Sequence, residues 1–158
     1  MTTVPFTHVV VTAPNRFVEE VYLDQLEDIL RPYGLINITV VSDPAGLRIG
    51  SGGGTLNALD KLRTALGHAT IQAAKVLIIH SGGDSRRAPL HSVSGKAFAS
   101  INASPSFSSS SQSSSADYTT PIAILIQELF SYFSKAMPSP CISTGYVCIA
   151  SSDVMLDL

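Results

Sequence analysis

Short runs of β-branched and apolar residues alternate with segments of helical spacing along this chain. One of these runs, Lys75–His80, reads Lys-Val-Leu-Ile-Ile-His. It is almost wholly apolar, which is typical of a strand covered on both faces of a sheet. Strands that alternate with helices form parallel sheets joined by right-handed crossovers. The pattern therefore predicts an α/β fold with a mostly parallel sheet. The other predicted strands are Thr7–Thr12, Ile36–Val41 and Gly145–Ala150.

Three segments carry apolar residues at the spacing of an α-helix, with polar residues between them. At the first of them, Asn15 is placed to cap the N-terminus, and Pro32 with Gly34 is placed to stop the helix. The intervals between the predicted strands are long enough for helical crossovers. The predicted helices cover Phe17–Leu30, Thr55–Leu66 and Pro121–Lys135.

A serine-rich stretch interrupts this alternation. Nine of the twelve residues in Ser104–Ser115 are serine. Such a composition cannot bury apolar surface, so the sequence predicts a disordered insertion over residues 104–116. A phosphorylated tract is the alternative interpretation. Apart from this insertion, we expect residues 1–158 to form one domain or part of one.

Composition and charge exclude several classes of protein. With 45% hydrophobic residues and a net charge of −2, the chain can bury a core and has no bulk attraction to nucleic acid or anionic membranes. Its apolar runs fall below the roughly 20 residues of a membrane span. Met1–His8 lacks the charged and apolar regions of a secretory signal. Cys141 and Cys148 have neither metal-ligand nor redox spacing, so we expect a cytoplasmic protein with reduced cysteines.

A glycine-rich segment, Gly50-Ser51-Gly52-Gly53-Gly54-Thr55, precedes the second predicted helix and is expected to open it. Glycines let a backbone approach a ligand closely, and a helix N-terminus presents free N–H groups to an anion. The segment is no Walker loop, because no Gly-Lys-Ser/Thr follows, and Thr55 replaces the third glycine of a dinucleotide fingerprint. Anion binding and a tight strand-to-helix turn therefore remain as alternatives.

A second glycine-containing segment follows the apolar strand that ends at His80. It reads Ser-Gly-Gly-Asp-Ser-Arg-Arg-Ala-Pro, and Ser-Gly-Lys comes a few residues later, ending at Lys96. The carboxyl edge of a parallel sheet is where such folds bind ligands. Adjacent arginines bind phosphate oxygens, and nucleotidyl transfer needs this neutralisation of charge. A solvated loop whose arginines pair with acids is the alternative.

Asp153 follows the last predicted strand directly after Ser151-Ser152. A carboxylate at the end of a parallel strand is well placed to hold Mg²⁺, although a lone Asp there is more often a turn or cap residue. His80 and His91 lack metal-ligand spacing, so we interpret His80 as a core or edge histidine. No Gly-x-Ser-x-Gly elbow is present, and the sequence gives a serine hydrolase no support.

The two glycine motifs, in this order, resemble a known family. The segment Gly82–Pro89 followed by Gly95-Lys96 is similar to the signature loop of sugar nucleotidylyltransferases, Gly-Gly-x-Gly-Thr-Arg-Leu-x-Pro followed by Pro-Lys. Ser85-Arg86 replaces the usual Gly-Thr, and Gly95 replaces the second proline. These departures are typical of the fucokinase / GDP-fucose pyrophosphorylase branch. Asp43–Gly46 and Arg48–Leu59 are also similar to that branch, so the resemblance covers nearly the whole chain apart from the serine-rich stretch.

The resemblance implies a Rossmann-like, three-layer α/β/α nucleotidyltransferase domain. It implies a reaction in which GTP and L-fucose 1-phosphate give GDP-L-fucose and pyrophosphate, with Mg²⁺ as cofactor. The chain would then be the N-terminal, nucleotide-binding part of such a domain, incomplete at its C-terminus and inactive alone. The residues that match the motifs are Arg86, Arg87 and Lys96 for catalysis, Gly82, Gly83, Ser85, Gly52, Gly53, Gly54 and Thr55 for nucleotide binding, and Asp153 for the metal.

Two functions are compatible with the resemblance. The first is an active fucose-1-phosphate guanylyltransferase domain within a longer protein, one that could also carry a fucokinase module downstream. The second is a non-catalytic nucleotide-binding or scaffolding domain attached to an L-fucokinase. The first hypothesis predicts that Lys96 and Asp153 approach a common point beside Gly82-Gly83, whereas the second predicts that they do not.

Overall fold

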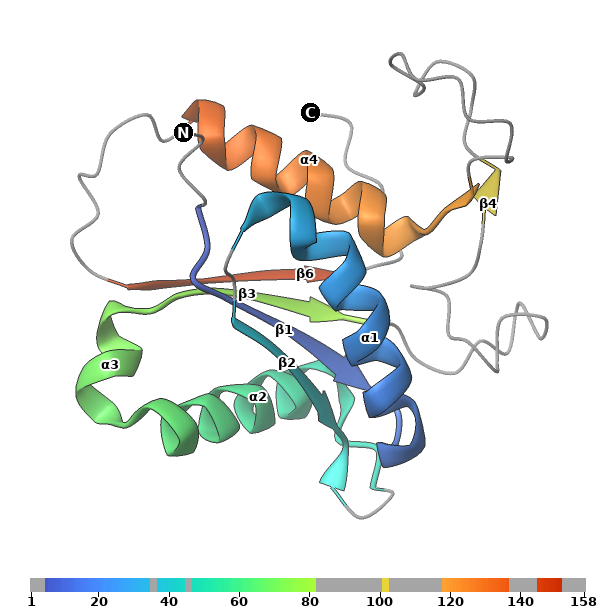
Figure 1. Cartoon of the computed structure of the whole chain (residues 1–158). Coiled ribbons are helices and arrows are strands. Elements are labelled where there is room, and N and C mark those ends of the chain that lie inside the picture. Colours follow the sequence, from blue (N-terminus) through green and yellow to red (C-terminus); the bar gives the residue numbers. More distant parts are fainter. Residues whose placement is uncertain are drawn as a thin grey trace.

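The computed structural model of the chain describes residues 5–34, 37–44, 47–81, 101–102, 118–136 and 145–151. The predicted serine-rich insertion lies outside the described residues. The described part has an α/β architecture, as the alternating sequence pattern predicts (Figure 1). None of its helices is long and apolar enough to cross a membrane.

Four strands form one sheet in the order β2-β1-β3-β6, and all neighbouring pairs are parallel. All four strands predicted from the sequence are present in this sheet, and their bounds lie within one residue of those expected. The strands of this sheet are β1 (His8–Ala13), β2 (Asn37–Ser42), β3 (Lys75–His80) and β6 (Tyr146–Ser151). A second, two-stranded antiparallel pair consists of β4 (Ile101–Asn102) and β5 (Tyr118–Thr119).

The helices differ from the predicted ones chiefly at their ends. Asn15 accepts a hydrogen bond from the Phe17 backbone N–H at 3.0 Å, so it caps the short 3₁₀ helix η1 rather than α1 itself. Gly34, with φ of 91°, ends the 3₁₀ helix η2, a conformation that glycine adopts without strain. The helices are η1 (Arg16–Val18), α1 (Glu19–Leu30), η2 (Arg31–Tyr33), α2 (Gly50–Leu66), α3 (His68–Ala73) and α4 (Pro121–Ala136).

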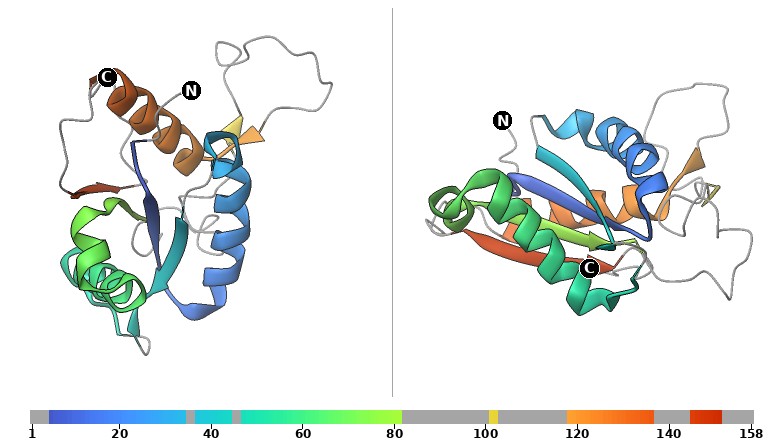
Figure 2. Two further views of the ribbon diagram at one scale, coloured as in Figure 1. Left: turned by 60° about the vertical axis from the view of Figure 1, so that its left-hand side comes forward. Right: turned by 90° about the horizontal axis from the view of Figure 1, so that it is seen from below.

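The helices cover the two faces of the sheet, which makes three layers. Helices α1 and α4 pack on one face, and α2 with α3 lies on the other (Figures 1 and 2). Side chains alternate between the faces along each strand. In β1, Val9 and Val11 join the core under α1 and α4, whereas Val10 joins the core under α2. Strand β3 is buried on both faces, which confirms the expectation from its apolar run.

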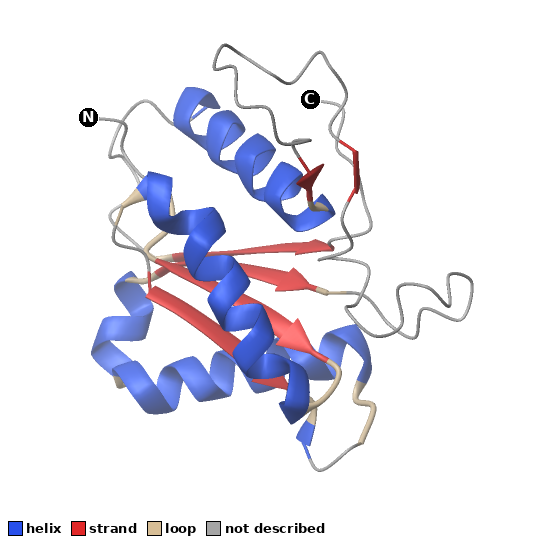
Figure 3. Cartoon of the chain, turned by 45° about the vertical axis from the view of Figure 1, so that its right-hand side comes forward, coloured by secondary structure: helices blue, strands red, loops and turns tan. Residues whose placement is uncertain are grey.

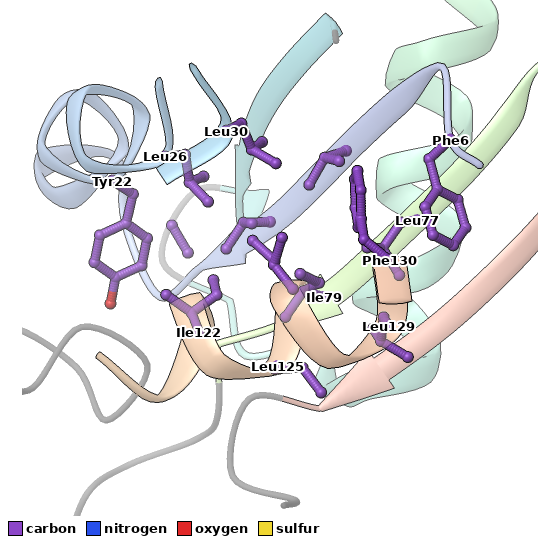
Figure 4. Close-up of a cluster of buried hydrophobic side chains, with 14 residues drawn as sticks. Phe6, Tyr22, Leu26, Leu30, Leu77, Ile79, Ile122, Leu125, Leu129 and Phe130 are labelled. Carbon is purple, nitrogen blue, oxygen red and sulfur yellow. The ribbon is translucent and has the colours of Figure 1, made fainter. Parts of the chain in front are cut away.

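The larger core lies between the sheet and the pair α1 and α4 (Figure 4). Tyr22 and Leu26 on α1 face Ile122 on α4 across the ends of the strands, and all three side chains are at most 2% exposed. Phe6 packs at the other end against Phe130, with ring centroids 5.5 Å apart. Burying one side chain of this size contributes about 1.5–3 kcal/mol to the free energy of folding. The packing of α1 and α4 therefore stabilises the position of the strands.

Candidate functional site at the carboxyl edge of the sheet

The four strands of the sheet end at the same edge (Figure 3). In the strand register, Ala13 pairs with Ser42, Thr12 pairs with His80, and His80 pairs with Ser151. Parallel α/β sheets bind their ligands at this carboxyl edge, where the connections leave the strands. Helix α2 begins here, so its N-terminus and the exit of β3 lie together.

The glycine-rich segment forms the first turns of α2, which confirms that it opens a helix. The helix begins at Gly50, five residues before the predicted start at Thr55. A glycine has no side chain to contribute to the apolar periodicity, so the pattern does not reveal that these residues are helical. Ile49 occupies the N-cap position and makes no side-chain cap, because it has no polar side-chain atom. Gly50 has φ of 67°, a backbone conformation that favours glycine.

The three glycines that follow have different surroundings. A methyl group at Gly52 would meet nothing within 4 Å, whereas one at Gly53 would lie 2.6 Å from Cβ of Ile49. Gly54 is buried, and a methyl group there would lie 3.4 Å from Cε1 of His80 and 3.6 Å from Cγ2 of Thr12. Gly54 therefore lets α2 approach the ends of β1 and β3 closely.

His80 connects the start of α2 to the end of β1. Its Nε2 lies 3.0 Å from Oγ1 of Thr55, and its Nδ1 lies 3.3 Å from Oγ1 of Thr12. The Thr55 hydroxyl also donates to the backbone carbonyl of Ser51 at 3.0 Å. The side chain of His80 thus lies between two threonine hydroxyls that come from different elements.

Ser81 is a buried polar residue, 4% exposed, at the exit of β3. Its backbone N–H donates to Oγ1 of Thr12 at 3.4 Å, on the face of the sheet that α2 covers. Its side chain shares a hydrogen bond with the hydroxyl of Tyr22, which belongs to α1 on the opposite face. Ser81 is therefore held from both faces, immediately before the Gly82-Gly83 motif.

Burial at the carboxyl edge of the sheet shifts the pKa values of His80 and Tyr22. Burial lowers the pKa of His80, and the charge of Asp43 at the end of β2 opposes this by raising it. Burial raises the pKa of Tyr22, and the hydrogen bond from Ser81 lowers it by a smaller amount. Both effects of burial favour the neutral form of the side chain.

The structure describes part of the predicted site. Gly52, Gly53, Gly54 and Thr55 lie at the carboxyl edge, in the first turns of α2, and their part in nucleotide binding stays a prediction. The segment with Gly82 follows Ser81 directly, and Asp153 lies two residues after Ser151, whose strand pairs with β3. The described residues contain no group of three or more His, Cys, Asp or Glu side chains that could hold a metal ion. The predicted site residues that lie outside the described residues are Gly82, Gly83, Ser85, Arg86, Arg87, Lys96 and Asp153.

Sequence reasoning did not single out Thr12 and Tyr22, and it included His80 and Ser81 at the start of the second glycine-containing segment without giving them a role. His80 is correctly placed as an edge histidine, since it is half-buried at the end of β3. Its position directly before Ser81-Gly82-Gly83 was the signal that could have linked it to the site. Its contacts with Thr12 and Thr55 depend on the register of β1 with β3 and on how closely α2 packs on the sheet. Neither can be read from a short stretch of sequence.

Comparison with known proteins identifies the family of this chain. The sequence profile of the Fucose pyrophosphorylase domain matches residues 68–158, more than half of the chain. The chain is 40% identical over 97 residues to Fucose-1-phosphate guanylyltransferase of Mus musculus, and 39% identical over the same length to that of Homo sapiens. Each of these alignments covers 59% of this chain and 16% of the relative.

A plant relative is also similar. The chain is 37% identical over 112 residues to Bifunctional fucokinase/GDP-fucose pyrophosphorylase of Arabidopsis thaliana, covering 57% of this chain and 11% of that protein. The chain thus spans a small part of the length of the curated relatives that it matches. No solved structure matches it significantly. The matching profile covers β3, α4 and β6 together with the segment after Ser81. Because it matches more than half of the chain, the chain belongs to the fucose pyrophosphorylase domain family.

Proposed function

We propose that this chain supplies the nucleotide side of a guanylyltransferase active site. In the whole protein the reaction would be the transfer of a guanylyl group from GTP to L-fucose 1-phosphate, which gives GDP-L-fucose and pyrophosphate. The relatives named as fucose-1-phosphate guanylyltransferases support the reaction. In the proposal, the sugar and the base are taken from those names.

One contact carries the proposal for the site. Thr55 at the start of α2 lies 3.0 Å from His80 at the end of β3, although the two residues are 25 positions apart in sequence. The contact brings the glycine-rich start of α2 beside the strand that leads into the Gly82-Gly83 motif. A helix N-terminus with free N–H groups favours phosphate, so both motifs would serve one nucleotide.

The chemistry places demands on the remaining predicted residues. An oxygen of the sugar phosphate attacks the α-phosphorus of GTP, and the bond from that phosphorus to the bridging oxygen breaks as pyrophosphate leaves. Arg87, with Arg86, would neutralise the departing pyrophosphate, and Lys96 would stabilise charge on the transferred phosphate.

Mg²⁺ belongs to the proposal as a cofactor. The Asp153 carboxylate is the kind of hard oxygen ligand that Mg²⁺ prefers, and it follows β6, which pairs with β3. The ion would supply a Lewis acid for phosphate oxygens when bound. Asp153 would hold it together with oxygens of the nucleotide.

Pyrophosphate release by the full-length protein, with GTP and L-fucose 1-phosphate, tests the proposal. We expect Lys96→Ala to lower kcat by about a hundredfold or more, because charge on the transferred phosphate loses its stabiliser. Lys61→Ala, on the exposed side of α2, is the matched control and should behave as wild type.

Two outcomes would contradict the proposal. Unchanged turnover in the Lys96→Ala variant would remove this mechanism. GTP binding without any pyrophosphate release by the wild-type protein would instead favour a non-catalytic nucleotide-binding or scaffolding domain, the second function that the sequence allows.

A further inference from the structure

The hydrogen bonds around His80 can be assigned a direction, because each hydroxyl carries a single proton. The Thr55 hydroxyl donates that proton to the carbonyl of Ser51, which can only accept. Toward Nε2 of His80, 3.0 Å away, Thr55 must therefore act as acceptor. Nε2 of His80 consequently carries a proton.

The other ring nitrogen follows from the same count. Oγ1 of Thr12 accepts the backbone N–H of Ser81 at 3.4 Å and still has its own proton to donate. Nδ1 of His80 lies 3.3 Å away, and in a neutral ring with Nε2 protonated it is a bare acceptor. Thr12 therefore donates to Nδ1, and every proton in the cluster has one acceptor.

The resulting chain of hydrogen bonds runs in one direction between the two glycine motifs. It begins at the backbone N–H of Ser81, passes through Thr12, His80 and Thr55, and ends at the carbonyl of Ser51 in the first turn of α2. Chains of this kind polarise and orient their members. An imidazolium would disrupt it, because the proton on Nδ1 would take the place of the one that Thr12 donates.

The surroundings of the ring agree with the neutral form. Gly54 of α2 faces the ring, since a methyl group at this position would lie 3.4 Å from Cε1 of His80. Burial disfavours the charged ring, and the one charged group that acts on it within the described residues is Asp43, whose effect opposes burial. The ring thus has a defined tautomer and a fixed place.

We propose that His80, as the neutral tautomer protonated on Nε2, is a positioning residue that holds the N-terminus of α2 at a fixed distance from Ser81, directly after β3. The inference rests on the proposed nucleotide site, because the role of His80 would be to hold the start of α2 and Ser81 in a fixed relation, next to the two predicted nucleotide-binding segments. His80 acts through Thr55 and Ser81 rather than on the nucleotide.

The test uses the full-length protein with His80→Leu, His80→Gln and a control, His68→Leu, which changes an exposed histidine on α3. An amide offers one donor and one acceptor at nearly the spacing of the ring nitrogens, so glutamine can replace both hydrogen bonds. We expect His80→Leu to raise KM for GTP about tenfold with a smaller change in kcat, and His80→Gln to restore most of it. His68→Leu should match wild type.

A second measurement keeps this inference separate from the proposed function. Hydrogen–deuterium exchange in the nucleotide-free protein should increase at the start of α2 and at Ser81 in His80→Leu and return toward wild type in His80→Gln. The exchange measurement does not depend on catalysis. If the wild-type protein releases no pyrophosphate, the proposed function is wrong, but the positioning role of His80 can still be tested. Normal turnover with wild-type KM and wild-type exchange in His80→Leu would overturn the positioning role. A failure of glutamine to restore either quantity would overturn the hydrogen-bond assignment.

Discussion

Gly54 lies against the imidazole of His80: a methyl group at position 54 would be 3.4 Å from Cε1 of the ring. This is ordinary van der Waals contact, so the site admits an alanine but nothing larger. Gly54→Ala should leave the fold intact and gain up to about 1 kcal/mol in helix propensity. Gly54→Val should cost about 1–3 kcal/mol, because the branched side chain would overlap His80 or Thr12. Urea unfolding of the two variants checks this, and equal stability would contradict the close packing.

Gly52 and Gly53 form a contrasting pair within the same turn. A methyl group on Gly52 has open space, so Gly52→Ala should stabilise the domain by about 1 kcal/mol. On Gly53 the methyl would lie 2.6 Å from Cβ of Ile49, and the backbone would have to move, so Gly53→Ala should destabilise it.

The stabilising member of that pair also tests the nucleotide site. If phosphate approaches the free N–H groups of this turn, the Gly52→Ala variant should bind GTP several-fold more weakly despite its higher stability. Unfolding and GTP titration on one preparation give both values. An increase in stability with unchanged GTP affinity would place the nucleotide away from Gly52.

The hydrogen bond between Tyr22 and Ser81 should make the effects of substituting the two residues on the unfolding free energy non-additive. Tyr22→Phe removes a partner of the buried Ser81 side chain, which costs about 1–3 kcal/mol. Ser81→Ala should cost a similar amount. The double variant should cost less than the sum, by about 0.5 kcal/mol or more, because both substitutions remove the same interaction. Additive losses would show that the two hydroxyls do not depend on each other.

Stability should fall on mild acidification. The pKa of His80 is lowered in the folded chain, mainly by burial, and so is that of His8. The unfolded chain therefore binds more protons than the folded chain below about pH 6.5, the ordinary value for histidine. The free energy of unfolding is highest above that pH and declines as the pH falls from there toward the lowered pKa values.

His80→Gln separates the contributions to this acid dependence. In this variant His80 no longer contributes to the pH dependence of stability, whereas His8 still does. Its unfolding free energy should therefore change less with pH than that of wild type. Urea titrations at a series of pH values from neutral to acidic measure the difference. An unchanged slope would assign the effect to other groups.

The fold could be predicted from local pattern because its strands are short apolar runs and its main helices have apolar stripes. The pattern missed α3, since His68–Ala73 is too short to show a helical period. It placed the start of α2 late, because glycines have no side chains. The partners of His80 could not be predicted, since they come from the register of β1 with β3 and from how closely α2 approaches through Gly54. Lys96 and Asp153 lie outside the described residues, so their roles stay predictions, argued from charge, from position after a predicted strand and from resemblance to a motif.

The order of strands in the sheet has a consequence for how the domain assembles. Paired residues of β1 and β3 are 68 positions apart in sequence, and those of β3 and β6 are 71 apart. Once β1 and β2 are paired, however, β3 is reached through the 32 residues that follow β2, whereas 65 residues separate β3 from β6. Closing a longer loop costs more entropy and is slower. We therefore expect β2, β1 and β3 to form a nucleus with the start of α2 already in place. The docking of β6, the strand that Asp153 follows in sequence, would then be the late step that completes the sheet.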